Sequence, residues 1–160
     1  MSREALTTYL KDHLAGSVAA VELLDFLIGL HGGSSREEVL TKLRIEVEED
    51  QNVLRRLLNQ AGGSESTVRR AAAWLTEKLG QIKLKVDDPG SGQLQVLEGL
   101  ETLELGIQGK LALWRALAAA ADGIPQIRDL DLTTLERRAR DQIDRVQGLR
   151  LEVARLALFS

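Results

Sequence analysis

The first feature of this sequence that could form a chemically active site is a run of acidic residues. The segment IEVEEDQNVLRRLL, residues 45–58, carries Glu46, Glu48, Glu49 and Asp50 inside an otherwise ordinary helical pattern. Carboxylates are ligands that hard divalent cations take from proteins. The run therefore raises the hypothesis of a metal site, which depends on whether the carboxylates share one face of the helix.

The helical periodicity separates these acids onto different faces. Asp50 interrupts an apolar stripe, whose other positions are Leu40, Leu43, Val47, Leu54 and Leu57. Glu49 falls on the opposite side of the helix, with Glu48 beside it. We therefore expect Glu46, Glu48 and Glu49 to form a solvated face, paired with Arg44 and Arg55. Only Asp50 is expected in the interior.

Other kinds of active site find little support in the sequence. The chain has no cysteine, which excludes disulfides, thiolate catalysis and Cys-based zinc sites. No nucleophile stands beside a base in a recognisable motif, and no glycine-rich phosphate loop occurs. We therefore name no catalytic and no cofactor-binding residue. A net charge of −3 and 3% aromatic residues give no basis for nucleic-acid binding.

Long segments of 3.6-residue periodicity predict an all-α protein with a single domain, residues 1–160. Ser35 with Glu38, and Thr133 with Glu136, have the spacing of capping boxes, and Gly32 and Gly33 supply a C-cap. A shorter amphipathic segment, at about 66–80, is expected to end at Gly80 and continue as an extended strap, QIKLKV. The four long helices are expected at about 3–30, 35–60, 93–121 and 133–158.

The lengths of the connections predict the topology. The loops after the first and third long helices are short, so each pair forms an antiparallel hairpin. The middle connection is long enough to return along the bundle, because a helix rises about 1.5 Å per residue. The second and third long helices should therefore run parallel. The sequence predicts a four-helix bundle of two hairpins with an additional crossover helix.

Three stretches carry a resemblance to a known family. YLKDHLAGSVAAVELL, EKLGQIKLKV and LETLELGIQGKLALWRAL, within this order of two hairpins and a crossover, resemble the ferritin-like superfamily, in particular a group of uncharacterised bacterial ferritin-like domains. The resemblance covers nearly the whole chain. It implies a ferritin-like bundle and says little about activity.

Di-iron members of that superfamily use one Glu on each of two helices and a Glu-x-x-His motif on each of the others. Both histidines are missing at the matching positions, and only Glu104 points inward. We therefore expect no di-iron centre and no bound metal, with iron or another divalent metal as the alternative. The residues at that spacing are Glu22, Glu49 with Asn52, Glu104, and Asp141 with Asp144.

Each long helix nevertheless carries one large polar residue on its apolar stripe: His13, Asp50, Glu104 and Gln142. Folding the hairpins about residues 33 and 125, with the second and third long helices starting level near residues 36 and 92, brings all four into one layer, with Glu46 at its edge. Such a layer could fix helix register by hydrogen bonding. It could also be the remnant of a metal or small-ligand site. In the third reading one or more of these residues, His13 first, turns to the surface.

Three glycines inside one predicted helix also need a reason, because each costs about 1 kcal/mol relative to alanine. Gly99, Gly106 and Gly109 share a face through spacings of seven and three. Absent side chains let another backbone approach closely. The crossover strap is the expected neighbour, and a partner subunit is the alternative.

The N-terminus shows no signal-peptide pattern, and no apolar run is long enough to span a bilayer, so we expect a cytoplasmic protein that does not bind membranes. Apolar residues outside the core stripe favour a homodimer through the first and second helices: Val18, Val21, Phe26 and Ile28. The sequence identifies no other protein partner. The expected function is non-enzymatic, structural or interaction-based. The rival function is a metal-binding or di-iron oxidoreductase-like protein that uses a degenerate carboxylate site.

Overall fold

A computed structural model describes residues 3–86 and 92–159 of the chain, and every regular element in those two ranges is helical. The prediction of an all-α protein is confirmed. Three short 3-10 helices occupy connections, at Glu65–Thr67, Ala121–Gly123 and Pro125–Ile127. The five α-helices are α1 (Arg3–Leu30), α2 (Ser35–Gln60), α3 (Val68–Val86), α4 (Gly92–Ala119) and α5 (Leu132–Leu158).

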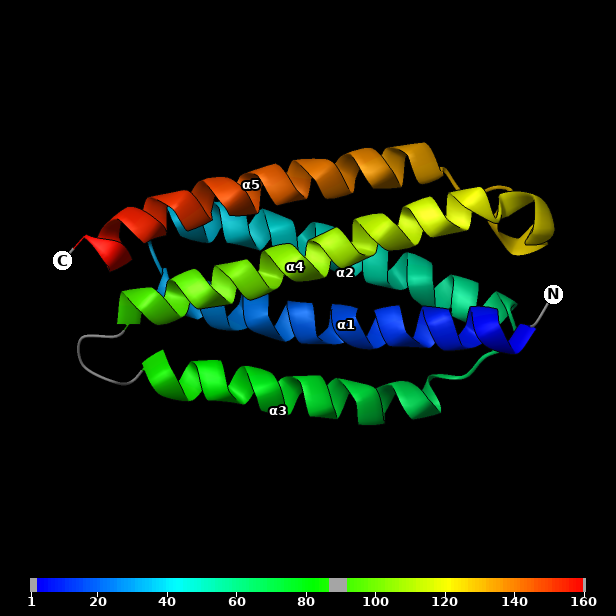
Figure 1. Ribbon diagram of the computed structural model, residues 1–160, viewed down its shortest axis with the longest axis horizontal. Coiled ribbons are helices and arrows are strands. Elements are labelled where there is room, and N and C mark those ends of the chain that lie inside the picture. Colours follow the sequence, from blue (N-terminus) through cyan, green and yellow to red (C-terminus); the bar gives the residue numbers. More distant parts are fainter. Residues whose placement is uncertain (1–2, 87–91, 160) are drawn as a thin grey trace.

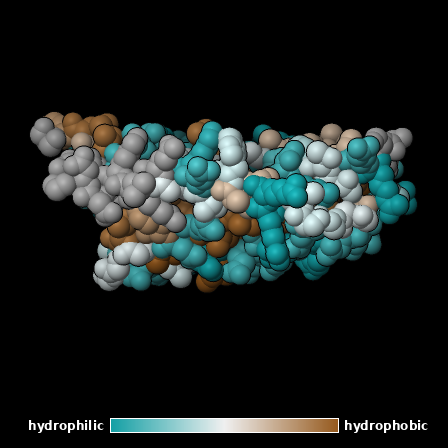
Figure 2. Space-filling view, turned by 90° about the horizontal axis from the view of Figure 1, so that it is seen from below, coloured by the Kyte–Doolittle hydropathy of each residue, from teal (hydrophilic) through white to brown (hydrophobic). Residues whose placement is uncertain are grey.

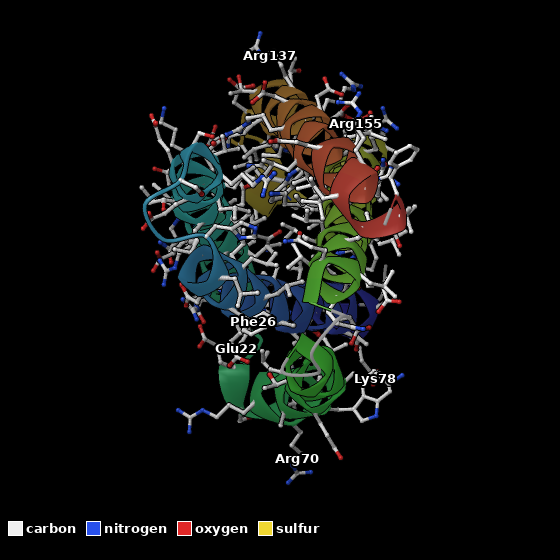
Figure 3. All side chains as sticks on the ribbon, turned by 90° about the vertical axis from the view of Figure 1, so that its left-hand side faces the viewer. Glu22, Phe26, Arg70, Lys78, Arg137 and Arg155 are labelled. Carbon is white, nitrogen blue, oxygen red and sulfur yellow. The ribbon has the colours of Figure 1, made fainter. Side chains whose placement is uncertain are left out.

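Four of the helices form a bundle, and the fifth lies outside it. Helices α1, α2, α4 and α5 surround a common core, whereas α3 packs against the outer side of α1 and α4 (Figure 3). Helices α1 and α2 are antiparallel, as are α4 and α5 (Figure 1). Because α3 returns along the length of the bundle, α2 and α4 run in the same direction (Figure 1).

Leucine and alanine supply most of the core, in keeping with the small share of aromatic residues. The long helices meet through side chains that repeat at three and four residues, which is the spacing that keeps one face inward. Trp114 of α4 is the largest fully buried side chain, at 0% exposure. On α1 the fully buried leucines are Leu10, Leu14, Leu23, Leu24 and Leu27.

The caps of two helices lie close to the predicted positions but use different residues. Ser34, not Ser35, caps α2: its hydroxyl accepts from the Glu37 amide at 3.4 Å, and the Glu37 carboxylate accepts from the Gly33 amide at 2.6 Å. Ser34 with Glu37 thus takes the place predicted for Ser35 with Glu38, but the Glu37 carboxylate binds the amide of Gly33 and not that of the cap residue. Asp131, not Thr133, caps α5 by accepting from the Thr134 amide at 3.1 Å. Gly33 takes the left-handed conformation, with φ of 78°.

Helix α3 corrects the prediction of an extended strap. Its backbone stays helical through Gly80 and on to Val86. A glycine in a helix costs only about 1 kcal/mol relative to alanine, and the residues on either side of Gly80 are mostly good helix formers. The cost of one glycine is therefore too small to end the helix.

The glycines of α4 were expected to admit the crossover strap, residues 81–86, whose side chains lie outside the described part of the chain. A Cβ atom added at Gly106 or Gly109 would meet nothing within 4 Å. At Gly99 the nearest atoms belong to Leu27 and Leu23 of α1, at 3.4 and 3.8 Å, and not to the crossover helix. Among the described atoms, no other backbone comes within 4 Å of a Cβ added at these three glycines.

Two features of the surface concern the partner and location predictions. Seen from the side of α3, hydrophobic atoms gather toward the end of the bundle where α1 and α5 end (Figure 2); Leu30, Leu94 and Leu156 are exposed there. Among the described residues, one helix, α1, is long enough and apolar enough to cross a membrane, judged by length and composition alone. Core helices and signal sequences share that composition, so this finding alone does not assign a location.

Candidate functional site

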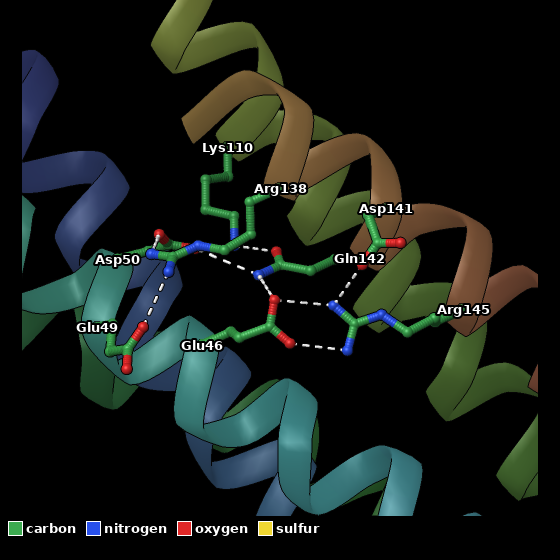
Figure 4. A network of polar contacts seen from close by, with 8 residues as sticks. All are labelled: Glu46, Glu49, Asp50, Lys110, Arg138, Asp141, Gln142 and Arg145. Atoms are coloured by element: carbon green, nitrogen blue, oxygen red, sulfur yellow. Dashed lines mark hydrogen bonds and ion pairs between the residues drawn. The ribbon is translucent and has the colours of Figure 1, made fainter. Parts of the chain in front are cut away.

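A cluster of charged and polar side chains joins α2, α4 and α5 in the interior of the bundle (Figure 4). Asp50 of α2 is 2% exposed, and Gln142 of α5 is fully buried. The Lys110 ammonium of α4 lies between them. Its Nζ atom is 2.6 Å from Asp50 Oδ2 and donates a second hydrogen bond to Gln142 Oε1. The cluster therefore places a cation where three helices meet.

Asp50 has a second cationic partner. Arg138 of α5 donates to Asp50 Oδ1 and, through its other terminal nitrogen, to Glu49 Oε2 at 2.8 Å. Each carboxylate oxygen of Asp50 thus faces one positive charge. A buried carboxylate is stable only when it is paired in this way. The two cations of the protein, Lys110 and Arg138, therefore compensate the Asp50 carboxylate from within.

Gln142 links this pair to a second one. Its amide nitrogen lies 3.4 Å from both Asp50 Oδ2 and Glu46 Oε1. Glu46 receives two contacts from Arg145, at 2.7 and 2.8 Å, which is the bidentate geometry that suits a guanidinium and a carboxylate. Arg145 also pairs with Asp141 at 2.8 Å. The four carboxylates and three cations form one continuous network across α2, α4 and α5.

Burial and neighbouring charges shift the pKa values of the groups in this network in opposite directions. Burial lowers the pKa of Lys110, and the neighbouring Asp50 carboxylate offsets only part of that effect. Burial alone would raise the pKa of Glu46, but the Arg145 hydrogen bond and charge outweigh it and leave that pKa lowered. The pKa of Arg138 is raised because Asp50 outweighs its burial. Arginine and glutamate therefore remain charged, and Lys110 is the group whose proton is held least firmly.

Two members of the predicted layer occupy the cluster, and Glu104 does not. Glu104 is half-buried and pairs instead with Arg150 of α5, at 2.9 Å. It precedes Lys110 by six residues, or about 9 Å along the helix. The prediction assumed that α2 and α4 begin level at residues 36 and 92. The Asp50–Lys110 contact instead pairs positions 60 apart in sequence, so α4 is displaced by about one turn.

His13, the remaining member, lies half-buried on α1 and does not contact Asp50. Its ring packs edge-on against Tyr9, with centroids 4.7 Å apart. Burial lowers its pKa, and Asp12 opposes the shift. His13 and Asp50 nevertheless line the same cavity between α1, α2 and α4.

Lys110 and Arg138 were missed by the sequence analysis, although the sequence carries a signal for Lys110. The inward positions of α4 are Leu103, Ile107, Trp114 and Leu117, all buried. Lys110 completes that series at spacings of four and three. Arg138 stands beside the inward Ala139 of α5. Its side chain is nevertheless only 27% exposed and reaches inward to Asp50.

The surface acids are paired differently from the prediction. Glu48 pairs with Arg44 at 2.9 Å, as expected. Glu46 and Glu49 instead pair with arginines of α5, as described above. Arg55 pairs with Glu65 at 3.5 Å. Glu48 and Glu49 are exposed, as predicted, whereas Glu46 is only 22% exposed and joins α2 to α5.

The side chains do not fit a di-iron centre. Within residues 3–86 and 92–159, no three His, Asp or Glu side chains converge on a position that could hold a metal ion. Asn52, Asp141 and Asp144 are exposed, and Glu104 is engaged by Arg150. Lys110 brings a positive charge to the inner carboxylate, Asp50. A divalent cation at that carboxylate would be repelled by the ammonium beside it.

Comparisons with models of protein families, with curated proteins and with solved structures find no match to this chain.

Proposed function

We propose that this protein is a non-enzymatic helical bundle of the ferritin-like arrangement, with a structural or interaction role and no di-iron centre. Two antiparallel hairpins, the parallel course of α2 and α4, and the crossover helix α3 support the ferritin-like arrangement. The absence of any match to a known family means that this assignment depends on topology and on the resemblance of the sequence.

The observation that carries the proposal is the position of the Lys110 ammonium. It lies 2.6 Å from Asp50 and in contact with Gln142, at the junction of three helices. A carboxylate there needs a cation, and lysine supplies one from within the chain. Because the ammonium and Arg138 already neutralise Asp50, no external metal is required for the core to be stable. The cluster then fixes how α2, α4 and α5 are aligned along the bundle axis.

The rival function, a metal-binding or di-iron oxidoreductase-like protein, has one supporting observation. Glu46 and Asp50 stand one turn apart on α2 and both contact the amide of Gln142. Two carboxylates and an amide oxygen are a plausible partial ligand set. Each carboxylate is nevertheless already paired with an arginine of α5, and we therefore prefer the structural role.

Elemental analysis of the protein purified without chelator separates the two functions. We expect iron, manganese and zinc far below one ion per chain, because the inner carboxylate is already neutralised. Asp50→Ala and Glu104→Ala, each compared with wild type, identify the ligands of any metal that is found. At least one ion per chain, lost in either variant, would establish the rival function.

We further propose that the protein is cytoplasmic and associates as a homodimer through α1 and α2. Val18, Val21 and Ile28 are half-buried, and each retains apolar surface outside the core. Ile45 of α2 is 52% exposed and adds to the same pair of helices. The competing surface lies on α4 and α5, where Leu105 is 72% exposed.

A further inference from the structure

Helix α3 lies on the outside of the molecule, and one of its faces is open to solvent. The helix packs mainly against α1 and α4 (Figure 3). Val68 and Ala72 are buried on its inner side, whereas Trp74 is 56% exposed. Tryptophan is highly buried on average, because its ring has a large apolar surface. Packing within the bundle therefore does not account for Trp74.

Two cations flank this tryptophan along α3. Arg70 precedes Trp74 by four residues and Lys78 follows it by four, so the three share one face of the helix. Arg70 and Lys78 point away from the bundle (Figure 3). The Lys78 ammonium lies 4.1 Å from the centroid of the Trp74 ring. Arg69, also exposed, adds a third cation, and we call these four residues the outer face of α3.

The charge of α3 is opposite to that of the chain. Residues 68–86 contain five Lys/Arg residues and one acid, Glu77, which gives a net charge of +4, whereas the whole chain carries −3. Counting the two aspartates that follow directly in the sequence leaves a charge of +2. On α1, Asp12 and Lys11 share a hollow with the start of α3, and their charges cancel. Such a local excess of positive charge attracts an anionic partner.

The cations of the outer face are not engaged inside the protein. Among residues 3–86 and 92–159, no carboxylate forms an ion pair with Arg69, Arg70 or Lys78. Because this face is the convex side of the outermost helix, it presents a ridge and not a groove (Figure 3). Peptides and small ligands bind in grooves and clefts. A ridge of cations instead suits a soft, extended anionic surface.

We propose that the outer face of α3 docks on the surface of an anionic lipid bilayer. Arg69, Arg70 and Lys78 lie against the negative headgroups, and Trp74 enters the boundary between headgroups and acyl chains. Each Lys or Arg near such a surface adds attraction, and tryptophan prefers that boundary. Nucleic acid fits less well, because single-strand binding uses several aromatic rings along a positive groove, whereas this ridge has one ring.

The proposal is independent of the structural role proposed above, and it is compatible with a cytoplasmic protein. The cytoplasmic leaflet of a cell membrane carries a negative surface potential. The expectation that the chain does not bind membranes followed from the lack of a spanning apolar run. A contact made by one face of a helix at the membrane surface does not need such a run.

Co-sedimentation of the full-length protein with lipid vesicles tests the proposal. We expect the protein to pellet with vesicles of about 30% phosphatidylserine in phosphatidylcholine, and to stay in solution with phosphatidylcholine alone. Raising sodium chloride from about 50 mM to about 500 mM should release it, because salt screens charges near a surface. Tryptophan emission should shift to shorter wavelength on binding. Since Trp114 is fully buried, that shift reports on Trp74.

Two variants of equal charge test the location. Arg69→Gln/Arg70→Gln/Lys78→Gln should weaken vesicle binding by about a hundredfold, at about fivefold for each cation removed. The control should bind within about threefold of wild type, because it removes exposed cations outside α3: Arg56→Gln, Arg128→Gln and Arg155→Gln. Glutamine is a good helix former, and thermal unfolding establishes that both variants are folded.

Four results would overturn the proposal, and the first two need no variant. The protein could fail to pellet with phosphatidylserine vesicles at low salt. It could pellet equally with phosphatidylcholine alone, which would mean that charge does not direct the contact. The folded control variant could lose as much binding as the outer-face variant. Finally, a single-stranded oligonucleotide at equal phosphate concentration could bind as tightly as the vesicles, which would make the face a general polyanion site.

Discussion

Lys110 and Asp50 form the interaction on which most of this description depends. A buried ion pair contributes little relative to apolar residues of equal volume, but breaking it by removing one partner is expensive. Both side chains are well buried, with exposures of 11% for Lys110 and 2% for Asp50. The pair should therefore matter more for specifying how the helices align than for net stability.

Removal of the Asp50 carboxylate should destabilise the protein strongly. We expect Asp50→Ala to lower the free energy of unfolding by about 3–5 kcal/mol, because Lys110 is left buried without its counterion. The double variant Asp50→Leu with Lys110→Met should recover much of that loss. Glu104→Ala is the control: it should cost less than Asp50→Ala, because its partner Arg150 is 26% exposed and also lies 3.8 Å from Glu101. Urea unfolding gives all three values. An Asp50→Ala protein as stable as Glu104→Ala would contradict a buried pair.

Acid should weaken the fold through His13 before it affects Glu46. The folded-state pKa of His13 lies below 6.5, so between that pKa and 6.5 the unfolded chain binds more protons. Stability must therefore fall as the pH drops below 6.5. The folded-state pKa of Glu46 lies below 4.5, so its contribution is complete above 4.5 and is lost as the pH falls through the lowered value.

Urea unfolding at about pH 7.5 and about pH 5 tests this order. We expect wild type to lose stability between the two, and His13→Gln to lose less because its unfolded chain gains one proton fewer. An equal loss in His13→Gln and wild type would show that His13 does not cause the effect.

The sequence predicted some of these residues and missed others for a physical reason. Asp50 and Gln142 each interrupt an apolar stripe. Because the stripe faces the core, a polar residue on it is directed into the interior. Lys110 breaks a stripe in the same way. A lysine, however, usually extends its long chain so that its charge reaches water. Only the presence of Asp50 and Gln142 opposite, on other helices, holds it inside.

At the scale of the helices, glycine positions are the most direct test of local packing. Gly106→Ala and Gly109→Ala should each raise the free energy of unfolding by about 0.5–1 kcal/mol, since nothing opposes the new methyl group. Gly62→Ala is the opposite case. Gly62 has φ of 80°, and an added Cβ would lie 2.8 Å from Arg3. We expect that variant to be destabilised in thermal unfolding. Loss of stability in both α4 variants would mean that a neighbour does approach these glycines.

Helix existence was easier to predict than helix ends. The long apolar periods fix four helices, because each must bury one face along its whole length. Caps depend on one or two local hydrogen bonds, so a shift of the cap from Ser35 to Ser34 leaves the apolar face of the helix unchanged. The path of α3 beyond Gly80 was wrong for a similar reason, since the cost of one glycine is small beside the helix propensity of its neighbours.

For the molecule as a whole, the connection lengths predicted which helices run parallel, but not their relative height. Each hairpin is fixed by its own connection, of four residues between α1 and α2 and of twelve residues between α4 and α5. The position of the second hairpin along the bundle axis, relative to the first, depends on where α4 starts. The crossover connection allows that start to vary by a turn or more. Glu104 was therefore placed beside Asp50, while the structure brings Lys110 there.

The native mass of the intact protein, purified without chelator, tests the central claim most directly. The claim is that a lysine supplies the cation of the core in a self-associating bundle. We expect a dimer of twice the 17.6 kDa chain mass, with no mass added by metal. Ile45→Glu should shift it to monomer if α1 and α2 form the contact, whereas Leu105→Glu should not. A monomer at micromolar concentration would contradict the dimer, and a species carrying one or two metal ions per chain would contradict the role of Lys110.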